Sequence, residues 1–419
     1  MEPDPRPTGE LNDQMVADEE RISRNRQALH DAHLDLFICA LPINVLLLSG
    51  YWPVIGNAIC VFTSDGQTQL FVPEDERPFT ERSWADRVVT FSAGSLYSLD
   101  GLINMIWTPL SEWLSTIAAG QTRIGLEGGP AHVPASYVAM NVFGEALPEL
   151  VRSMLPHASF FIADQHLARL RSTLTDMEIE NVRTACAVAA VAFEEGRMRL
   201  RPGVTERQAA NAFRATLSAP GQGFKSIARA DGQTFCMSGP NSYNAAAAFQ
   251  HSSDRRLRSD DIVLIHCNSY ADGFWTDITR TYALAKASEL TQKIFATILE
   301  ARHAALDVIR PGARSADVDR VARSVIKQCG FGDQFKHGLG HAVGYHAIDH
   351  NARPRLHPMS SDVLETGMVF NVEPGIYIEY FGGVRHCDMV AVTETGAELL
   401  TPFESTTDEL FLFSETAAA

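Results

Sequence analysis

Five side chains of the kinds that bind metal ions are spread over the second half of the sequence, namely His266, Asp277, His341, Glu373 and Cys387. Four short motifs carry them: IHCNSYADGFWTDITR, HGLGHAVG, NVEPGIY and GGVRHCD. Two of the five are carboxylates within apolar stretches, where an unpaired buried charge is costly. A nearby cation is the simplest explanation for these two carboxylates.

The first motif has the pattern of a buried β-hairpin. Residues 261–267 form a short apolar run, and residues 275–280 are predicted to form the return strand after a glycine-containing turn. Alternation along a strand places His266 and Asn268 on one face. An antiparallel return strand would bring Asp277 beside His266, so we expect the two side chains to lie close together.

In order and context these motifs resemble the pita-bread family, which contains Xaa-Pro aminopeptidases, prolidases, methionine aminopeptidases and the metal-free creatinase. The five ligands of that family read Asp, Asp, His, Glu, Glu, whereas this chain has His266 for the first Asp and Cys387 for the last Glu. The resemblance covers residues from about 20 to 405. It implies an α/β (α+β) chain, with a creatinase-like N-terminal domain and a C-terminal domain in which helices enclose a curved antiparallel sheet.

Chain length also indicates two domains, because 419 residues exceed the usual size of one hydrophobic core. We expect a disordered tail at residues 1–15, a creatinase-like domain with a mixed sheet at residues 16–165, and the pita-bread catalytic domain at residues 166–412. The resemblance further implies a homodimer.

The N-terminal domain begins with a helical pattern over residues 18–33. Two apolar runs of β type follow, at residues 34–41 and 44–51. The runs 58–62 and 69–72 flank the Asp-Gly turn at position 65 and predict a hairpin.

The second half contains two similar pairs of helices. Capping boxes at Thr175 and Thr205 begin the helices of the first pair, and a helix that starts at Ser315 completes the second pair. Pro-Gly follows the first helix of each pair, at Pro202 and Pro311, an offset of 311 − 202 = 109 residues. Pro-Gly is common punctuation by itself. Because strand-like segments with candidate ligands follow each pair, the pattern favours two related α-β units.

The resemblance assigns roles to several residues. His341 corresponds to a metal ligand and His337 to a histidine of the substrate pocket, and Glu373 or a neighbouring carboxylate takes a proton from water. Arg385 shares a strand face with Cys387 and is expected at the substrate.

Two pocket histidines of the family are replaced. Phe249 stands where the first would be, and Ile348 where the second would be. His346 and His350 flank the second position, and either could take its place.

The donor set favours one metal ion. In a two-metal peptidase the replaced Glu bridges both ions and the replaced Asp chelates one of them with two oxygens, whereas an imidazole gives a single bond. His, Asp, His, Glu and Cys together suit one borderline ion better than a hard pair. We expect one divalent metal per chain, with zinc or iron favoured over manganese or cobalt.

The first functional hypothesis is a metal-dependent hydrolase of a small peptide with proline in the second position, or of a related amide. An alternative is a creatinase-like C–N hydrolase or lyase acting on a small zwitterion. A third is nucleophilic catalysis by Cys387 with His266 as base, which Asp277 and Glu373 disfavour because nearby carboxylates raise a thiol pKa. A binding scaffold without catalysis is the fourth.

Composition argues against two classes of partner, nucleic acids and membranes. The formal charge of −16 and the pI near 5.3, without a basic cluster, argue against a nucleic-acid partner. No apolar run reaches the roughly 18 residues of a membrane-spanning helix, and the acidic N-terminus is unlike a secretory signal. We therefore expect no membrane partner and a cytoplasmic location. The seven cysteines lack a C-x-x-C pair and suggest no disulfide framework.

Overall fold

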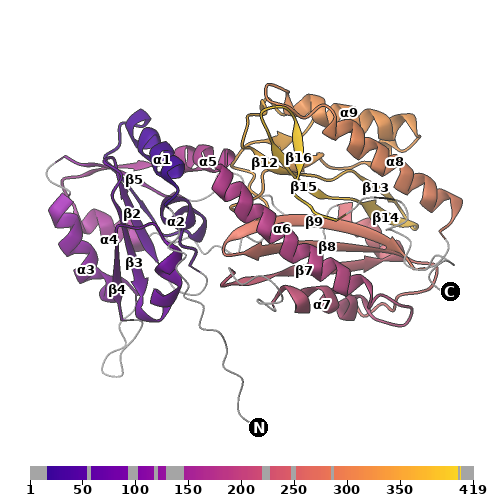
Figure 1. Cartoon of the computed structure of the whole chain (residues 1–419), viewed down its shortest axis with the longest axis horizontal. Helices are drawn as coiled ribbons and strands as arrows, with labels where there is room; N and C mark the ends of the chain where they lie inside the picture. The colour runs from indigo at the N-terminus through magenta and orange to yellow at the C-terminus, as the bar shows by residue number, and fades with distance from the viewer. Residues whose placement is uncertain are drawn as a thin grey trace, which may run out of the picture. The chain divides into compact units, whose positions relative to one another are not determined.

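The computed structural model describes residues 17–53, 58–92, 102–117, 121–128, 146–218, 227–246, 252–284, 287–403 and 406 (Figure 1). These residues form two compact units: apart from Gly128, which groups with the second unit, the first unit ends at Ala163 and the second begins at Asp164. The predicted tail at residues 1–15 lies outside the described residues. None of the described helices is long and apolar enough to cross a membrane.

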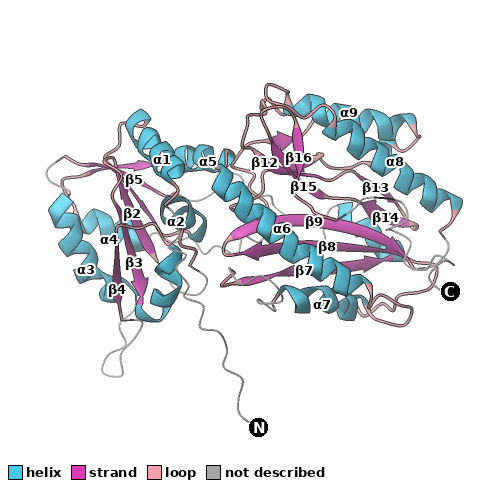
Figure 2. Ribbon diagram, in the orientation of Figure 1, coloured by secondary structure: helices cyan, strands magenta, loops and turns pink. Residues whose placement is uncertain are grey.

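A six-stranded mixed sheet forms the centre of the first unit, with the strand order β4-β3-β2-β1-β5-β6. Strands β2, β3, β4 and β5 of this sheet are labelled in Figure 2. Its antiparallel pairs are β1–β2 and β2–β3, and the other neighbours are parallel. The predicted mixed sheet and the predicted β2–β3 hairpin are therefore confirmed. The strands are β1 (Leu36–Cys39), β2 (Ile59–Thr63), β3 (Thr68–Pro73), β4 (Arg87–Phe91), β5 (Arg123–Leu126) and β6 (Ser159–Ile162).

Helices flank this sheet, and the first begins where the sequence predicts. Asp18 is the N-cap of the first helix, and its side chain accepts a hydrogen bond from the backbone N–H of Arg21. A 3₁₀ helix connects β3 to β4. The elements are α1 (Glu19–Asp31), α2 (Pro42–Ser49), α3 (Leu102–Ile117), α4 (Ala146–Met154) and η1 (Glu74–Arg82).

The β-type run predicted at residues 44–51 is wrong, because these residues belong mainly to helix α2. Pro42 occupies the first turn of α2, and Gly50 ends the helix in the left-handed conformation with a φ of 72°. Residues 44–49 are all buried. A helix without a polar face has the same apolar run as a buried strand, so its periodicity does not distinguish the two.

The second unit contains antiparallel strands throughout. Sheets β7-β8-β9 and β12-β15-β16 have three strands each, and β13–β14 and β10–β11 are two-stranded. Backbone hydrogen bonds between Thr279 and Cys387 connect β9 with the segment between β14 and β15. The strands are β7 (Ala230–Ser238), β8 (Ile262–Ala271), β9 (Phe274–Ala283), β10 (Gly340–His341), β11 (Arg355–Leu356), β12 (Val369–Val372), β13 (Gly375–Ile378), β14 (Gly382–Arg385), β15 (Asp388–Val392) and β16 (Ala397–Leu399).

Two helix pairs accompany these strands, in the predicted order. Both predicted capping boxes are present, at Thr175 and Thr205. Ser315 is the first helical residue of the last helix, and Arg314 takes the cap position without a side-chain capping bond. The elements are α5 (Asp164–Ser172), α6 (Asp176–Arg197), α7 (Glu206–Leu217), α8 (Glu289–Leu306), α9 (Ser315–Gln328), η2 (Gly239–Ala246) and η3 (Gly332–Gln334).

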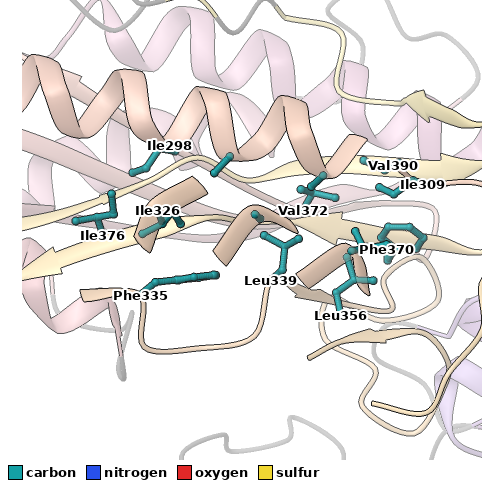
Figure 3. Packing of buried hydrophobic residues seen from close by; sticks show 14 of the residues in the cluster. Ile298, Ile309, Ile326, Phe335, Leu339, Leu356, Phe370, Val372, Ile376 and Val390 are labelled. Carbon is teal, nitrogen blue, oxygen red and sulfur yellow. The ribbon is translucent and has the colours of Figure 1, made fainter. Parts of the chain in front are cut away.

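A hydrophobic core lies between the second helix pair and the C-terminal strands (Figure 3). Ile298 of α8 and Ile326 of α9 belong to it, together with Phe370 and Val372 of β12. Leu339, two residues before the candidate ligand His341, is fully buried in the same cluster. The core therefore supports the segments that carry candidate metal ligands.

Asp388, at the start of β15, connects three elements by buried ion pairs. Its Oδ1 accepts from Arg280 Nη2 of β9 at 2.6 Å, and its Oδ2 accepts from Arg302 Nε of α8. His386 Nε2 lies 3.3 Å from Oδ2. Burial alone would raise the pKa of Asp388, but Arg280, His386 and Arg302 hold it well below the ordinary value. One carboxylate thus balances two buried arginines.

We expect Asp388→Asn to lower the free energy of unfolding by about 3–5 kcal/mol, because it leaves buried arginines without a counter-charge. Asp317→Asn is the matched control: its partner is Arg320 at 3.0 Å, both side chains are exposed, and the loss should stay within about 1 kcal/mol. Urea unfolding followed by circular dichroism measures both. Equal effects of the two substitutions would contradict the role of Asp388.

Candidate metal centre and its cavity

A cavity of about 520 Å³ opens in the second unit, where four of the five candidate ligands meet. His266, Asp277, His341 and Glu373 line it. The lining also includes the following side chains named from the sequence: His337, Ile348, His350 and Arg385. Cys387 is fully buried and lies outside the lining. The motifs therefore converge, as the family resemblance predicts.

The β8–β9 hairpin determines the positions of the first two candidate metal ligands, His266 and Asp277. His266 pairs across the hairpin with Thr279, and Asn268 pairs with Asp277. Asp277 therefore lies diagonal to His266, with 3.6 Å between His266 Nδ1 and Asp277 Oδ1. The shared face of His266 and Asn268 is confirmed, because His266 Nε2 lies 3.0 Å from Asn268 Oδ1.

His341 points its Nε2 towards two carboxylates. Its Nδ1 lies 3.1 Å from the carbonyl oxygen of Ala342, which only accepts, so Nδ1 carries the proton. Its Nε2 lies 3.4 Å from Asp277 Oδ2 and 3.8 Å from Glu373 Oε1. Asn371 supports this placement: its Oδ1 accepts the backbone N–H of His341 at 2.7 Å, and its Nδ2 is 3.1 Å from the ring Nε2.

Gly340 allows His341 to approach this closely. A Cβ atom at position 340 would lie 1.9 Å from the backbone oxygen of Asn371. The glycine before His341 is therefore required by the close packing of β10 against β12, which explains the last Gly of the HGLGH motif in physical terms.

Burial and charge shift the pKa values of the three cavity groups. Burial raises the pKa of Glu373 to about 7, with a further contribution from Asp277. The pKa of Asp277 falls to about 2, because His266, His341 and Arg385 outweigh its burial. Burial would lower the pKa of His341, but Asp277 and Glu373 raise it. This corner of the cavity therefore attracts a positive charge.

Asp277, His341 and Glu373 fit one metal ion by the chemistry of their donor atoms. The imidazole Nε2 of His341 faces two carboxylates, and Nδ1 is fixed by a carbonyl, as in metal-binding histidines generally. Within the described ranges, no group of three or more His, Cys, Asp or Glu side chains is preorganised around a common point as a metal site. Binding would thus need the three side chains to close on the ion.

Arg385 is the charged centre of the neighbouring part of the cavity. It donates from Nη2 to His266 Nδ1 at 2.9 Å, from Nε to Thr279 Oγ1 at 3.2 Å, and from Nη1 to the Ala245 carbonyl at 3.4 Å. Its Nη1 lies 3.7 Å from Glu373 Oε2. The side chain is only 5% exposed, so its charge acts in a poorly screened environment.

Cys387 is placed as a neutral thiol. Its Sγ donates to the backbone oxygen of Asp277 at 3.0 Å. Burial, with the carboxylates of Asp277 and Glu373, raises the pKa of the thiol well above its ordinary value. The direction predicted from the sequence is confirmed, and it disfavours Cys387 as a nucleophile.

His337 and Tyr377 form a second neutral pair. His337 Nδ1 lies 2.8 Å from the carbonyl of Gly338 and therefore carries the proton, so the Tyr377 hydroxyl donates to His337 Nε2 at 2.8 Å. Burial and Arg385 lower the pKa of His337 to about 3. His337 consequently holds the phenol of Tyr377 in place.

The structure distinguishes the two histidines that flank Ile348. His350 lines the cavity, and its ring centroid lies 5.3 Å from that of His341. His346 packs on Trp275, with ring centroids 5.8 Å apart, and lies outside the lining. His350 is therefore the better placed of the two for substrate contact. The third expected pocket residue, Phe249, lies outside the described residues.

Sequence reasoning missed Asn371, Thr279 and Tyr377. All three occur inside the quoted motifs: Asn371 and Tyr377 are the first and last residues of NVEPGIY, and Thr279 is the second-last residue of IHCNSYADGFWTDITR. Their types carry no metal-binding signal. Strand alternation could have indicated two of them, because Asn371 and Glu373, like Asp277 and Thr279, are two residues apart.

Comparison with known proteins agrees with this geometry. Residues 180–394 match Metallopeptidase family M24, and residues 21–156 match the Creatinase/Prolidase N-terminal domain. An Xaa-Pro dipeptidase of Pyrococcus furiosus is 29% identical over 386 residues, which cover 92% of this chain and 98% of that protein.

Solved structures show the same likeness. The prolidase from Pyrococcus furiosus has a TM-score of 0.70 at 28% identity, covering 90% of this chain and 99% of that one. The prolidase from Pyrococcus horikoshii OT3 has a TM-score of 0.71 at 25% identity, with coverages of 92% and 99%.

The fold and the convergent ligand motifs thus define a two-domain hydrolase of the pita-bread type. The chain belongs to metallopeptidase family M24 and has the creatinase/prolidase N-terminal domain. It is accordingly a metallohydrolase, and the family implies a divalent metal cofactor.

We expect Cys387 to resist alkylation in the native protein, because its thiol is buried and protonated. Cys329 is the internal control, since it is partly exposed whereas the other six cysteines are buried. Iodoacetamide at neutral pH, followed by peptide mass spectrometry, should label Cys329 first and Cys387 only after denaturation. Rapid labelling of Cys387 with loss of activity would instead support the nucleophilic hypothesis.

Proposed function

We propose that this chain hydrolyses small peptides with proline in the second position, using one divalent metal ion held by Asp277, His341 and Glu373. The observation that carries the proposal is the position of His341 Nε2, which faces both carboxylates at 3.4 and 3.8 Å. The similarity to an Xaa-Pro dipeptidase over 92% of the chain supports the substrate class. The cavity of about 520 Å³ is within the usual range for a small-molecule site.

The charges of the cavity support one ion rather than two. Asp277 and Glu373 carry two negative charges when ionised and Arg385 carries one positive charge, which gives −2 + 1 = −1. One divalent ion changes this sum to +1, whereas two would change it to +3. A buried charge of that size is strongly disfavoured. Zinc or iron(II) remains the favoured ion, because an imidazole and two carboxylates suit a borderline metal.

When bound, the ion would supply Lewis-acid chemistry for amide hydrolysis. The chain's own residues have separate tasks. Glu373 directs Oε1 towards His341 and Oε2 towards Arg385, so we assign to it the transfer of a proton from water to the leaving amine. His350 lines the approach to His341, and the His337–Tyr377 pair borders the substrate.

The proposal extends to assembly and location. We propose a cytoplasmic homodimer, on the resemblance to two-domain members of the family. The free thiol state of all seven cysteines suits a reducing compartment. Light scattering coupled to size-exclusion chromatography measures the assembly.

The purified protein should contain about one zinc or iron per chain, and His341→Ala should lose it. Plasma mass spectrometry measures the content after incubation with zinc, iron(II), manganese and cobalt in turn. Two ions per chain would contradict the charge argument. No ion in the wild type under any of these conditions would remove the metal-dependent hypothesis and favour creatinase-like chemistry on a small zwitterion.

Xaa-Pro dipeptides should be cleaved faster than matched Xaa-Ala dipeptides, and chelator should abolish cleavage. Glu373→Gln should lower kcat/KM by about 10²–10⁴-fold, the usual contribution of a general acid–base group. Glu379→Gln is the control, because Glu379 is exposed and should leave the rate unchanged. Chromatographic detection of free proline provides the readout, and equal cleavage of Xaa-Ala and Xaa-Pro would contradict the proline preference.

A further inference from the structure

His266 uses both ring nitrogens for hydrogen bonds within the protein. Arg385 Nη2 can only donate, and it lies 2.9 Å from His266 Nδ1, so Nδ1 must be bare. The proton therefore sits on Nε2, which donates to Asn268 Oδ1 at 3.0 Å. The hydroxyl of Thr279, 2.9 Å from Nδ1, gives a second donor to the bare nitrogen. The partners thus define a neutral imidazole with one tautomer.

His341 has a different arrangement. Its protonated nitrogen faces a backbone carbonyl, and its Nε2 faces the carboxylates of Asp277 and Glu373. The bare Nδ1 of His266 lies 3.6 Å from Asp277 Oδ1 but is already occupied by the guanidinium of Arg385 at 2.9 Å. A divalent ion on His266 Nδ1 would have to displace Arg385 and Thr279, and the arginine charge would repel it.

The guanidinium is held from several directions at once. Ala245 of η2 accepts from Nη1, and Ser242 of the same 3₁₀ helix accepts the backbone N–H of Gly383 on β14, the strand of Arg385. The backbone N–H of Arg385 itself donates to Thr281 Oγ1 of β9 at 3.1 Å. The backbone on both sides is therefore fixed, and His266 provides the side-chain acceptor that selects the direction of Nη2.

We propose that His266 is a positioning residue for Arg385 rather than a metal ligand, and that Arg385 supplies a fixed positive charge where a two-metal relative would use a second ion. The inference rests on the proposed function for its catalytic meaning. Its geometric part, the acceptor role of His266, stands on hydrogen bonds alone. Arg385 then faces Glu373 Oε2 at 3.7 Å as a cation that no chelator removes.

Nuclear magnetic resonance of protein with ¹⁵N-labelled histidines tests the acceptor role directly. Long-range ¹H–¹⁵N correlation spectra should show the His266 ring as the neutral Nε2–H tautomer, assigned by the signals missing from His266→Asn. Addition of zinc should shift the His341 ring nitrogen and leave the tautomer of His266 unchanged. A His266 ring with the proton on Nδ1, or one whose nitrogen takes the shift typical of metal coordination, would overturn the inference.

Matched variants test the functional part. The side-chain oxygen of Asn can take the place of Nδ1, whereas that of Gln lies nearer to the place of Nε2. His266→Asn should keep the acceptor for Arg385, so its kcat/KM should be about tenfold higher than that of His266→Gln. About tenfold is the usual loss of activity when a residue that orients the ligands of a site is replaced. KM should change less than kcat, because substrate contacts remain. Equal losses in both variants would overturn the positioning role.

Metal content distinguishes this inference from the proposed function. His266→Asn and His266→Gln should keep about one ion per chain, whereas His341→Ala should lose it. Loss of the ion in both folded His266 variants would overturn the inference and leave the hydrolase intact. If Xaa-Pro dipeptides are not cleaved but His266 has the expected tautomer, the proposed function is overturned and the positioning role stands. The protection of the Arg385 Nε–H against hydrogen exchange then replaces kcat as the measure of that role.

Discussion

The buried guanidinium of Arg385 is the interaction on which the cavity depends. A charge that is removed from water needs acceptors on every side, and here they come from β8, β9, η2 and the segment before β13. Each acceptor belongs to a different part of the chain, so the arginine fixes the spacing of these parts. Burial, with a contribution from the same charge, lowers the pKa of His337 to about 3 and that of His266 to about 4. In His341, by contrast, Asp277 and Glu373 raise the pKa.

Both departures from the family's ligand pattern reduce the negative charge of the cavity. A His replaces one carboxylate at position 266, and a thiol replaces another at position 387. In the structure both side chains satisfy their hydrogen bonds within the protein, at Asn268 and Arg385 for His266 and at the Asp277 backbone for Cys387. The proposed donors Asp277, His341 and Glu373 all line the cavity. Both substitutions therefore lower the negative charge near the cavity relative to the family's ligand pattern.

The family resemblance predicted the convergence of the motifs, whereas local patterns predicted the hairpin around His266 and the capping boxes at Thr175 and Thr205, because these depend on residues close together in the chain. It did not reveal which nitrogen of His266 is bare, since that depends on Arg385, 119 residues away. The helix α2 was mistaken for a strand because burial on all sides removed its periodicity. The choice between His346 and His350 likewise depends on long-range packing, on Trp275 in one case and His341 in the other.

The position of Leu339 has a consequence for how the site forms. This residue is buried in the core between α8, α9 and β12, and its backbone oxygen accepts the N–H of Glu373 at 2.8 Å. Two of the three donors therefore depend on a core whose helices and strands are far apart in the chain. Such non-local contacts form late, after the loop entropy between them has been overcome. Under the proposed function, metal capture would therefore report completed folding, since a partly folded chain would have the donor residues without the site.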